Sequence, residues 1–193
     1  MRQLHLTVGP NGSGKTTFVT EYLALELPPG YPYVNPDEIA QARWPASPAE
    51  HAYEAAQVAA ETRAHLIASG QSFIAETVFS HPSKLDLIRC AQEASYQVVL
   101  HVMLVPEELA VKRVAYRVRE GGHDVPEHKI RERYHRLWPL VSKAIAMADR
   151  AVVYDNSKRP GPAIVAEFRR GLPVGTVSWP EWAPEPMSSL SGE

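Results

Sequence analysis

The sequence predicts a three-layer α/β fold in which helices cover both faces of a parallel five-stranded sheet. Apolar, strand-like runs alternate along the chain with helical patterns, as in successive βαβ units. The runs are short and mostly apolar, which is typical of strands buried on both faces. The five expected strands are residues 4–8, 31–34, 72–75, 97–105 and 151–154.

Helical patterns occupy most of the segments between these runs. The expected helices are residues 15–25, 48–68, 82–94, 107–118, 127–148 and 161–170. Together they define one domain over residues 1–178. Residues 179–193 are rich in proline and serine and contain little to bury, so we expect a loose C-terminal tail.

The composition excludes several classes of protein. The 193 residues carry a net charge of −2, which does not favour a nucleic acid or a membrane surface as the partner. Cys90 is the only cysteine, which excludes an intramolecular disulfide and a cysteine-rich metal site. The N-terminus lacks the pattern of a secretion signal, and no apolar run approaches the length of a membrane span. We therefore expect a cytoplasmic location.

A glycine-rich segment between the first strand and the first helix indicates nucleotide binding. The segment is Gly9-Pro10-Asn11-Gly12-Ser13-Gly14-Lys15-Thr16, followed by Thr17, and it matches the Walker A pattern at every defined position. In such a loop the backbone N–H groups converge on the phosphates of ATP at a helix N-terminus. Lys15 is expected to reach the β- and γ-phosphates, and the Thr16 hydroxyl is expected to ligate Mg²⁺.

Other features narrow the class of P-loop protein. The sequence lacks the guanine-recognition motif of GTPases, and the run that ends at Val105 is followed by Pro106, not by the aspartate of motor and ABC-type ATPases. A small-molecule kinase remains. We therefore predict a P-loop kinase fold with the strand order 2-3-1-4-5.

Asp37 follows the second expected strand, at the sheet edge where ligands bind in open parallel sheets. Its carboxylate could accept the proton of an attacking hydroxyl. Asn35, Pro36 and the acids Asp37 and Glu38 also form a well-built helix start. The two roles are compatible, so we expect Asp37 to bind substrate and act in catalysis.

The order of these motifs resembles that of zeta-toxin-like kinases, in particular their short stand-alone branch. The resemblance covers residues 3–170 and rests on the P-loop and on segments 35–40, 75–80, 113–126 and 154–157. It implies that the acceptor is a hydroxyl of a nucleotide sugar of the UDP-N-acetylglucosamine type. It also implies that Asp37 is the general base, Lys15 the P-loop lysine and Glu76 an acceptor-binding acid.

The family's Glu-Gly-Thr after the third strand reads Glu76-Thr77-Val78 here, and no arginine shortly precedes Pro126. Glu76 and Thr77 are candidates for acceptor binding, although Glu76 could also support Mg²⁺ or simply open a surface loop. Glu61 is a third candidate, because the family uses an acid near this point. It belongs to a stripe of polar residues of the kind that usually forms a solvated helix face.

A basic segment after the fourth strand is the candidate phosphate lid. Of the 20 lysines and arginines, 8 lie between Lys112 and Arg136. Arg113 and Arg117 share one helical face and are expected to neutralise charge on the γ-phosphate during transfer. Arg119, His123 and Arg133 are weaker candidates. Gly121-Gly122 provides a break at which the segment could hinge. A solvated basic face is the alternative, and interspersed acids argue against nucleic acid.

Asn156 follows the fifth strand, where it could contact the adenine or ribose of ATP or form an Asx turn. These residues together predict an ATP- and Mg²⁺-dependent phosphotransferase that acts on a small molecule. A kinase for a nucleotide, a drug-like compound or a nucleic-acid end is one alternative, and a slow ATP-hydrolysing switch is another. The chain contains no feature that identifies an antitoxin partner.

Overall fold

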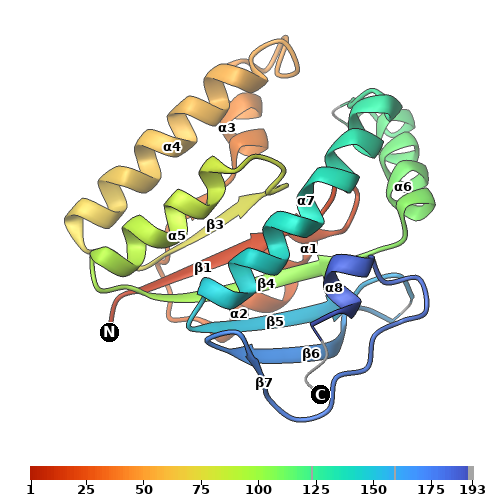
Figure 1. Ribbon diagram of the computed structural model, residues 1–193. Coiled ribbons are helices and arrows are strands. Elements are labelled where there is room, and N and C mark those ends of the chain that lie inside the picture. Colours follow the sequence, from red (N-terminus) through yellow and green to blue (C-terminus); the bar gives the residue numbers. More distant parts are fainter. Residues whose placement is uncertain (123, 159, 191–193) are drawn as a thin grey trace.

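A single sheet organises the chain in the computed structural model, which describes residues 1–122, 124–158 and 160–190 (Figure 1). Its seven strands follow the order β2-β3-β1-β4-β5-β6-β7. The strands are β1 (Gln3–Val8), β2 (Tyr33–Val34), β3 (Phe73–Thr77), β4 (Gln97–Leu104), β5 (Arg150–Asp155), β6 (Ala163–Arg169) and β7 (Leu172–Pro173).

The first five strands are parallel and have the expected order 2-3-1-4-5. β1 lies at the centre, with Leu6 in register with Ala75 of β3 and with Leu100 of β4. All five C-terminal ends therefore meet at one edge, from which the P-loop and Asp37 follow directly. The predicted fold class is confirmed, and the sheet has two strands more than expected.

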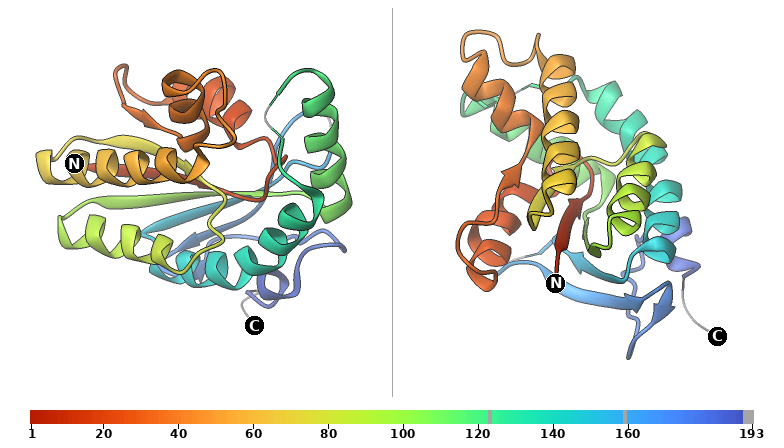
Figure 2. Two further views of the ribbon diagram at one scale, coloured as in Figure 1. Left: turned by 90° about the horizontal axis from the view of Figure 1, so that it is seen from above. Right: turned by 90° about the vertical axis from the view of Figure 1, so that its left-hand side faces the viewer.

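Alternating side chains of the sheet pack into two cores, and a third, small cluster of Val114, Val125 and Ile130 lies away from the sheet strands. Leu4, Leu6 and Val8 of β1 face a large core, which helices from the middle and the C-terminal half of the chain complete. The opposite face carries a smaller core in which Phe18 packs near Ile74 and Met103. The right-hand view of Figure 2 shows the resulting three layers, with the sheet between the two sets of helices.

The helices are close to those expected. The segment after the P-loop comprises α1 (Lys15–Phe18), a π-helical stretch (Val19–Leu23) and α2 (Ala24–Glu26). The other helices are α3 (Pro36–Arg43), α4 (Ala52–Ser69), α5 (Ser83–Glu93), α6 (Glu107–Arg119), α7 (Glu127–Met147) and α8 (Glu185–Ser188). α4 begins four residues later than predicted, and α7 continues through Pro139. α4, α5 and α7 cover the large core (Figure 1).

The helix expected over residues 161–170 is wrong. These residues form β6, which pairs antiparallel with β5, and β7 then pairs with β6. Ala166 and Phe168 are buried while Ile164 is 57% exposed, so alternate residues face the core as in a strand. The β-branched pair Ile164-Val165 also favours extended backbone over helix.

The expectation of a loose tail is also wrong for the part of the tail that the structure describes. Met187 of α8 is fully buried against the large core, and Trp179, Trp182 and Leu190 pack around it. Four apolar side chains spaced among prolines thus anchor a segment that composition alone describes as polar. Residues 191–193 lie outside the described residues. Within the described part of the chain, no helix has the length and apolar character needed to cross a membrane.

Candidate active site

The P-loop joins β1 to α1 and holds its shape through two glycines in left-handed backbone conformations. Gly12 has φ 74° and Gly14 has φ 83°. A Cβ atom at Gly12 would lie 2.6 Å from the Ala110 carbonyl oxygen, and one at Gly14 would lie 2.5 Å from the Asn156 amide nitrogen. Both positions therefore exclude a side chain for conformational and for steric reasons.

Lys15 lies at the base of this loop. Its ammonium donates a 2.9 Å hydrogen bond to the Pro10 carbonyl and lies 4.0 Å from the Glu76 carboxylate. Burial lowers the pKa of Lys15, while the nearby Glu76 and Asp37 carboxylates act in the opposite direction. The lysine is thus held in the loop by one backbone carbonyl and by the charge of nearby carboxylates.

Glu76, at the end of β3, is the hub of the polar network. Its buried carboxylate accepts hydrogen bonds from the Thr16 hydroxyl, at 3.0 and 3.2 Å, and from the Tyr33 phenol, at 2.5 Å. Asn35 donates to the Tyr33 oxygen at 3.0 Å and accepts from the backbone N–H of Asp37 at 2.9 Å. One continuous chain of contacts therefore connects Thr16 of the P-loop to Asp37.

These contacts also bear on Mg²⁺. In the part of the chain that the structure describes, no group of three or more histidine, cysteine, aspartate or glutamate side chains could hold a metal ion alone. The Thr16 hydroxyl beside the Glu76 carboxylate supplies hard oxygen donors of the kind that Mg²⁺ prefers. Mg²⁺ commonly takes few protein ligands and binds substrate phosphates as well, so this pair fits the ion.

An open cleft of about 790 Å³ lies over the P-loop. The predicted site residues that line it are Asn11, Gly12, Gly14, Lys15, Thr16, Thr17, Asp37, Glu76, Thr77, Arg113 and Arg117. Gly9, Pro10 and Ser13 do not line it and shape the loop from behind. Asp37 is exposed at the start of α3, where the Asn35 side chain caps the helix. The predicted helix start and the predicted position at the cleft are therefore both present.

Glu61 is not brought to this cleft. It is exposed on α4 and is not among the residues that line the cavity, as expected of a solvated helix face. Arg63, two residues further along α4, is buried, with 5% of its surface exposed. The stripe of polar residues that includes Glu61 thus lies on the outer face of α4, and Arg63 is the charged residue on its inner face.

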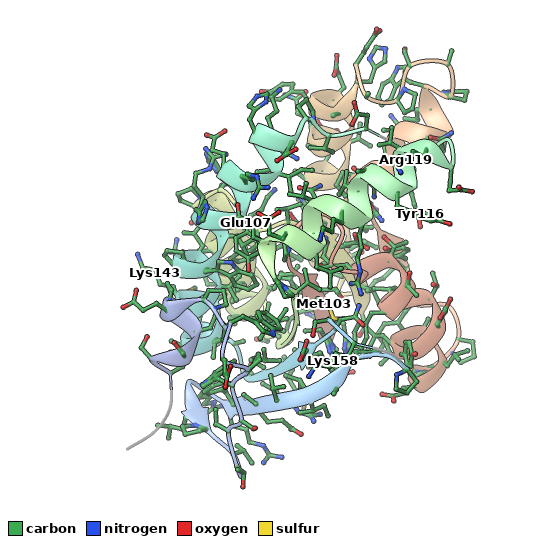
Figure 3. All side chains as sticks on the ribbon, turned by 90° about the vertical axis from the view of Figure 1, so that its right-hand side faces the viewer. Met103, Glu107, Tyr116, Arg119, Lys143 and Lys158 are labelled. Atoms are coloured by element: carbon green, nitrogen blue, oxygen red, sulfur yellow. The ribbon has the colours of Figure 1, made fainter. Side chains whose placement is uncertain are left out.

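The basic segment divides into two faces. Arg113 and Arg117 of α6 line the cleft, as do Lys129 and Arg133 of α7. Burial lowers the pKa of Arg113. Arg131 instead turns outward and forms ion pairs with Glu107, Glu108 and Glu127. Figure 3 shows α6 between Glu107 and Arg119, and Arg119 is exposed and does not line the cleft. His123 lies outside the described residues.

A second cavity of about 370 Å³ adjoins the first and shares Gly14, Thr17 and Arg113 with it. Its other walls include Phe18, Tyr22, Asn156 and Lys158. The Asn156 amide donates to the Ser13 carbonyl at 2.8 Å, so this side chain supports the P-loop while it lines the cavity. The backbone N–H of Ser157 bonds to the Asp155 carboxylate, which makes this turn an Asx turn.

Tyr33, Lys84 and Lys129 also line or support the cleft and were not among the predicted site residues. Tyr33 has a weak signal in the sequence, because it lies two residues before Asn35 at the end of a strand. Lys84 belongs to no motif, and Lys129 lies in the predicted basic segment without having been singled out in it. Only the packing of α5 and α7 against the sheet brings these two lysines to the cavity.

A family model described as "AAA domain" (AAA_33) matches residues 4–140 of this chain. The chain belongs to the AAA_33 family. The match contains the P-loop, Asp37, Glu76 and the basic segment through Arg136. No curated protein matches the sequence.

Solved structures similar to this AAA_33 protein share its fold. A chain of the AvrRxo1-ORF1:-ORF2 complex with ATP has a TM-score of 0.70 and 20% identity, over 90% of this chain and 60% of that one. A chain of the PezAT toxin–antitoxin system of Streptococcus pneumoniae has a TM-score of 0.64 and 14% identity, over 86% and 72%. Shikimate kinase from Acinetobacter baumannii, in complex with shikimate, has a TM-score of 0.52 and 20% identity, over 83% and 86%.

The AAA_33 protein thus spans 60% of the AvrRxo1 chain. These likenesses confirm the P-loop kinase fold, and the resemblance to zeta-toxin-like kinases holds at the level of the fold.

Proposed function

We propose that the protein is an ATP-dependent kinase that transfers the γ-phosphate to a hydroxyl group of a small molecule. The observation that carries the proposal is one cleft lined by Lys15 and Thr16 on the donor side and by Asp37 on the other. The adjoining cavity behind Thr17 is suitable for the nucleoside of ATP. Structures of this fold determined with ATP and with shikimate support ATP as the donor and a small molecule as the acceptor.

In the proposed reaction the acceptor oxygen attacks the γ-phosphorus while its proton passes to the Asp37 carboxylate. The bond from the γ-phosphorus to the bridging oxygen breaks, and ADP leaves. Lys15, Arg113 and Arg117 stabilise negative charge on the phosphate oxygens during this displacement. Mg²⁺, held through Thr16 with support from Glu76, would neutralise further phosphate charge when it is bound. Asn156 positions the loop through its bond to Ser13.

The finer part of the proposal concerns the acceptor and a protein partner. By resemblance to zeta-toxin-like kinases, we propose a nucleotide sugar of the UDP-N-acetylglucosamine type, with Glu76 and Thr77 near its sugar. Because one structural neighbour belongs to a toxin–antitoxin system, we also propose a protein partner of the antitoxin kind. Glu61 faces away from the cleft and is left out of the acceptor site.

The test is incubation of the purified protein with Mg·ATP and a pool of nucleotide sugars, nucleotides and other hydroxyl compounds. Mass spectrometry then identifies any compound that gains a phosphoryl group. A phosphorylated nucleotide sugar supports the full proposal, and a different phosphorylated compound corrects the acceptor. ADP without a phosphorylated product indicates the hydrolytic switch instead.

The control for this experiment is Lys15→Ala, which removes the ammonium while the glycines keep the loop shape. We expect transfer to be abolished with the thermal unfolding temperature unchanged. Undiminished transfer by the Lys15→Ala protein would overturn the kinase assignment.

A further inference from the structure

Arg63 is a buried cation whose charge no carboxylate balances. It lies on the inward face of α4 together with Ala55, Ala59 and Leu66 and is 5% exposed. Among the residues that the structure describes, none forms a hydrogen bond or an ion pair with its guanidinium. Burial lowers the pKa of Arg63, but an arginine stays charged at any physiological pH. A charge in so largely buried a position is costly unless it is balanced, and an anion in the adjoining cleft would balance it.

A second cation, Lys84, lines the cleft from the first turn of α5. No described residue bonds to its ammonium. Burial is the main cause of its lowered pKa, and the positive charge of Arg63 lowers it further. Ala52 and Ala56, in the N-terminal half of the same helix as Arg63, line this cleft, and long helical side chains generally extend toward the N-terminal end of their helix.

Two further cations line the cleft from α7, the half-buried Arg133 and the exposed Lys129. The structure describes no ion pair for either. By contrast, Arg131 and Arg136 on the same helix do not line the cleft and are paired with glutamates. Arg133 is half-buried where it lines the cleft, so among these arginines it is the one that the described carboxylates leave without an ion pair.

The cleft as a whole carries more positive side chains than the proposed function uses on the phosphates of ATP. Its walls carry six lysines and arginines against three carboxylates, which are Asp37, Glu76 and Asp124. Lys15, Arg113 and Arg117 have roles on the phosphate chain of ATP in the proposed function. Lys84, Lys129 and Arg133 have none there, and neither has Arg63 behind them.

We propose that Arg63 and Lys84, with Arg133 and Lys129 opposite, form a second anion-binding subsite for a carboxylate or phosphate group carried by the acceptor itself. This inference rests on the proposed kinase function and deepens it by naming the residues that would hold the acceptor. The diphosphate of a nucleotide sugar meets the need for an anion, whereas a neutral hydroxyl compound would leave these four cations unbalanced. Lys84 contacts the anion directly, and Arg63 supplies the buried charge behind it. The class of substrate is therefore an anionic alcohol.

The experiment uses the full-length protein saturated with Mg²⁺ and a non-hydrolysable ATP analogue, so that the P-loop is filled. Inorganic phosphate and, separately, succinate are titrated while the thermal unfolding temperature is followed, with sodium chloride holding the ionic strength constant. A ligand that binds only the folded state raises this temperature with a saturable dependence on concentration. We expect such a rise for at least one anion, and which anion gives it distinguishes a phosphate-bearing acceptor from a carboxylate-bearing one.

Lys84→Met is the decisive variant, because Lys84 is only partly buried and methionine fills similar space. We expect its affinity for the anion to fall about tenfold or more, the usual effect of losing a charged hydrogen bond. Arg63→Met should do the same. If Arg63→Met does not fold, Arg63→Lys, which keeps the charge, is the substitute and should retain binding. Arg89→Met, an exposed site on α5 paired with Asp86, is the matched control and should bind as the wild type does.

The absence of a saturable rise with both anions, or an equal rise in wild type and Lys84→Met, would overturn the subsite. This outcome is separate from failure of the kinase assignment, which is judged by phosphoryl transfer in the metabolite pool. Transfer to a neutral compound together with no anion binding would leave the kinase standing and remove the subsite.

Discussion

The Tyr33 phenol donates a 2.5 Å hydrogen bond to the Glu76 carboxylate, which also accepts from Thr16 of the P-loop. Burial and the neighbouring carboxylate raise the pKa of Tyr33, so it remains a neutral donor at all physiological pH values. Tyr33 of β2 thereby holds Glu76 of β3 beside the Thr16 hydroxyl, which is suited to Mg²⁺. A tyrosine outside any recognised motif is thus a positioning residue of the site.

Replacement of Tyr33 by phenylalanine removes this bond while Glu76 keeps its contact with Thr16. We expect kcat to fall about tenfold, the cost of a hydrogen bond to a charged group. We also expect a higher Mg²⁺ concentration for half-maximal activity, which a loss of packing alone would not cause. Tyr31→Phe is the control, because the Tyr31 hydroxyl bonds to Gln3 and lies outside the cleft. An unchanged Mg²⁺ requirement in Tyr33→Phe would contradict the positioning role.

Asp37→Asn keeps the shape of the side chain and removes its capacity to accept a proton. Turnover should fall by roughly 10²–10⁴, while ATP affinity stays within a few-fold of the wild type. Kinetics and equilibrium binding of ATP measure the two quantities separately. Glu38→Gln, the adjacent acid in the same turn, should leave turnover near normal. A parallel loss of ATP binding in Asp37→Asn would assign this residue to the metal or to the fold.

Arg113 and Arg117 are expected to act on the phosphate during transfer. Replacing either with alanine should lower kcat and kcat/KM together. Arg117→Lys should restore little activity, because an ammonium cannot reproduce the planar fork of a guanidinium. Arg119→Ala, at the exposed end of the same helix, is the control and should behave as wild type.

The same pair of arginines gives α6 and the Gly121-Gly122 break a role as a lid. Hydrogen exchange over residues 113–126 should slow when a non-hydrolysable ATP analogue binds. If exchange is the same with and without the analogue and both alanine variants are fully active, the basic segment is a solvated face and not a lid.

His5 and His101 predict a loss of stability in acid. Their buried rings stack on each other, with Nδ1 of His5 3.1 Å from Nε2 of His101. Burial lowers the pKa of His5 to about 4 and that of His101 to about 3. Between pH 6.5 and these values the unfolded chain binds protons that the folded chain does not. The stability is therefore fully present above pH 6.5 and falls as the pH falls, by about 1.4 kcal/mol per pH unit for each histidine.

Urea unfolding at pH 7 and pH 5 measures this loss. Other groups also titrate in the range, so the comparison is with His5→Gln, which should lose about 2 kcal/mol less than the wild type between the two pH values. Equal losses in both proteins would show that His5 does not contribute.

Local patterns allowed much of the fold and the donor side of the site to be predicted. The Walker A spacing fixes the P-loop, and the run of parallel strands places Asp37 at the same edge, because consecutive residues determine both. The course of residues 161–170 depends instead on pairing with β5, a long-range contact that a seven-residue pattern does not encode. Met187 likewise is buried only because α7 offers it a surface.

The acceptor side could not be predicted for a related reason. The polar stripe on α4 indicates a solvated face, and only the family resemblance made Glu61 a candidate. No pattern identified Arg63 on the inner face of the same helix. Lys84 belongs to no sequence pattern. It became a candidate for anion binding only because Arg63, 21 positions away in the sequence, lies near it in the structure. A cation without a carboxylate partner is visible only when the neighbours are known in space.

The two ends of the sheet have a consequence for the behaviour of the protein in concentrated solution. β2 and β7 are the outermost strands, and each has only two residues, one of which in β7 is Pro173. A strand edge exposes unpaired N–H and C=O groups that can recruit another chain, and short or proline-containing edges resist this. The antiparallel addition of β6 and β7 therefore replaces the long edge of β5 with a poor template for aggregation.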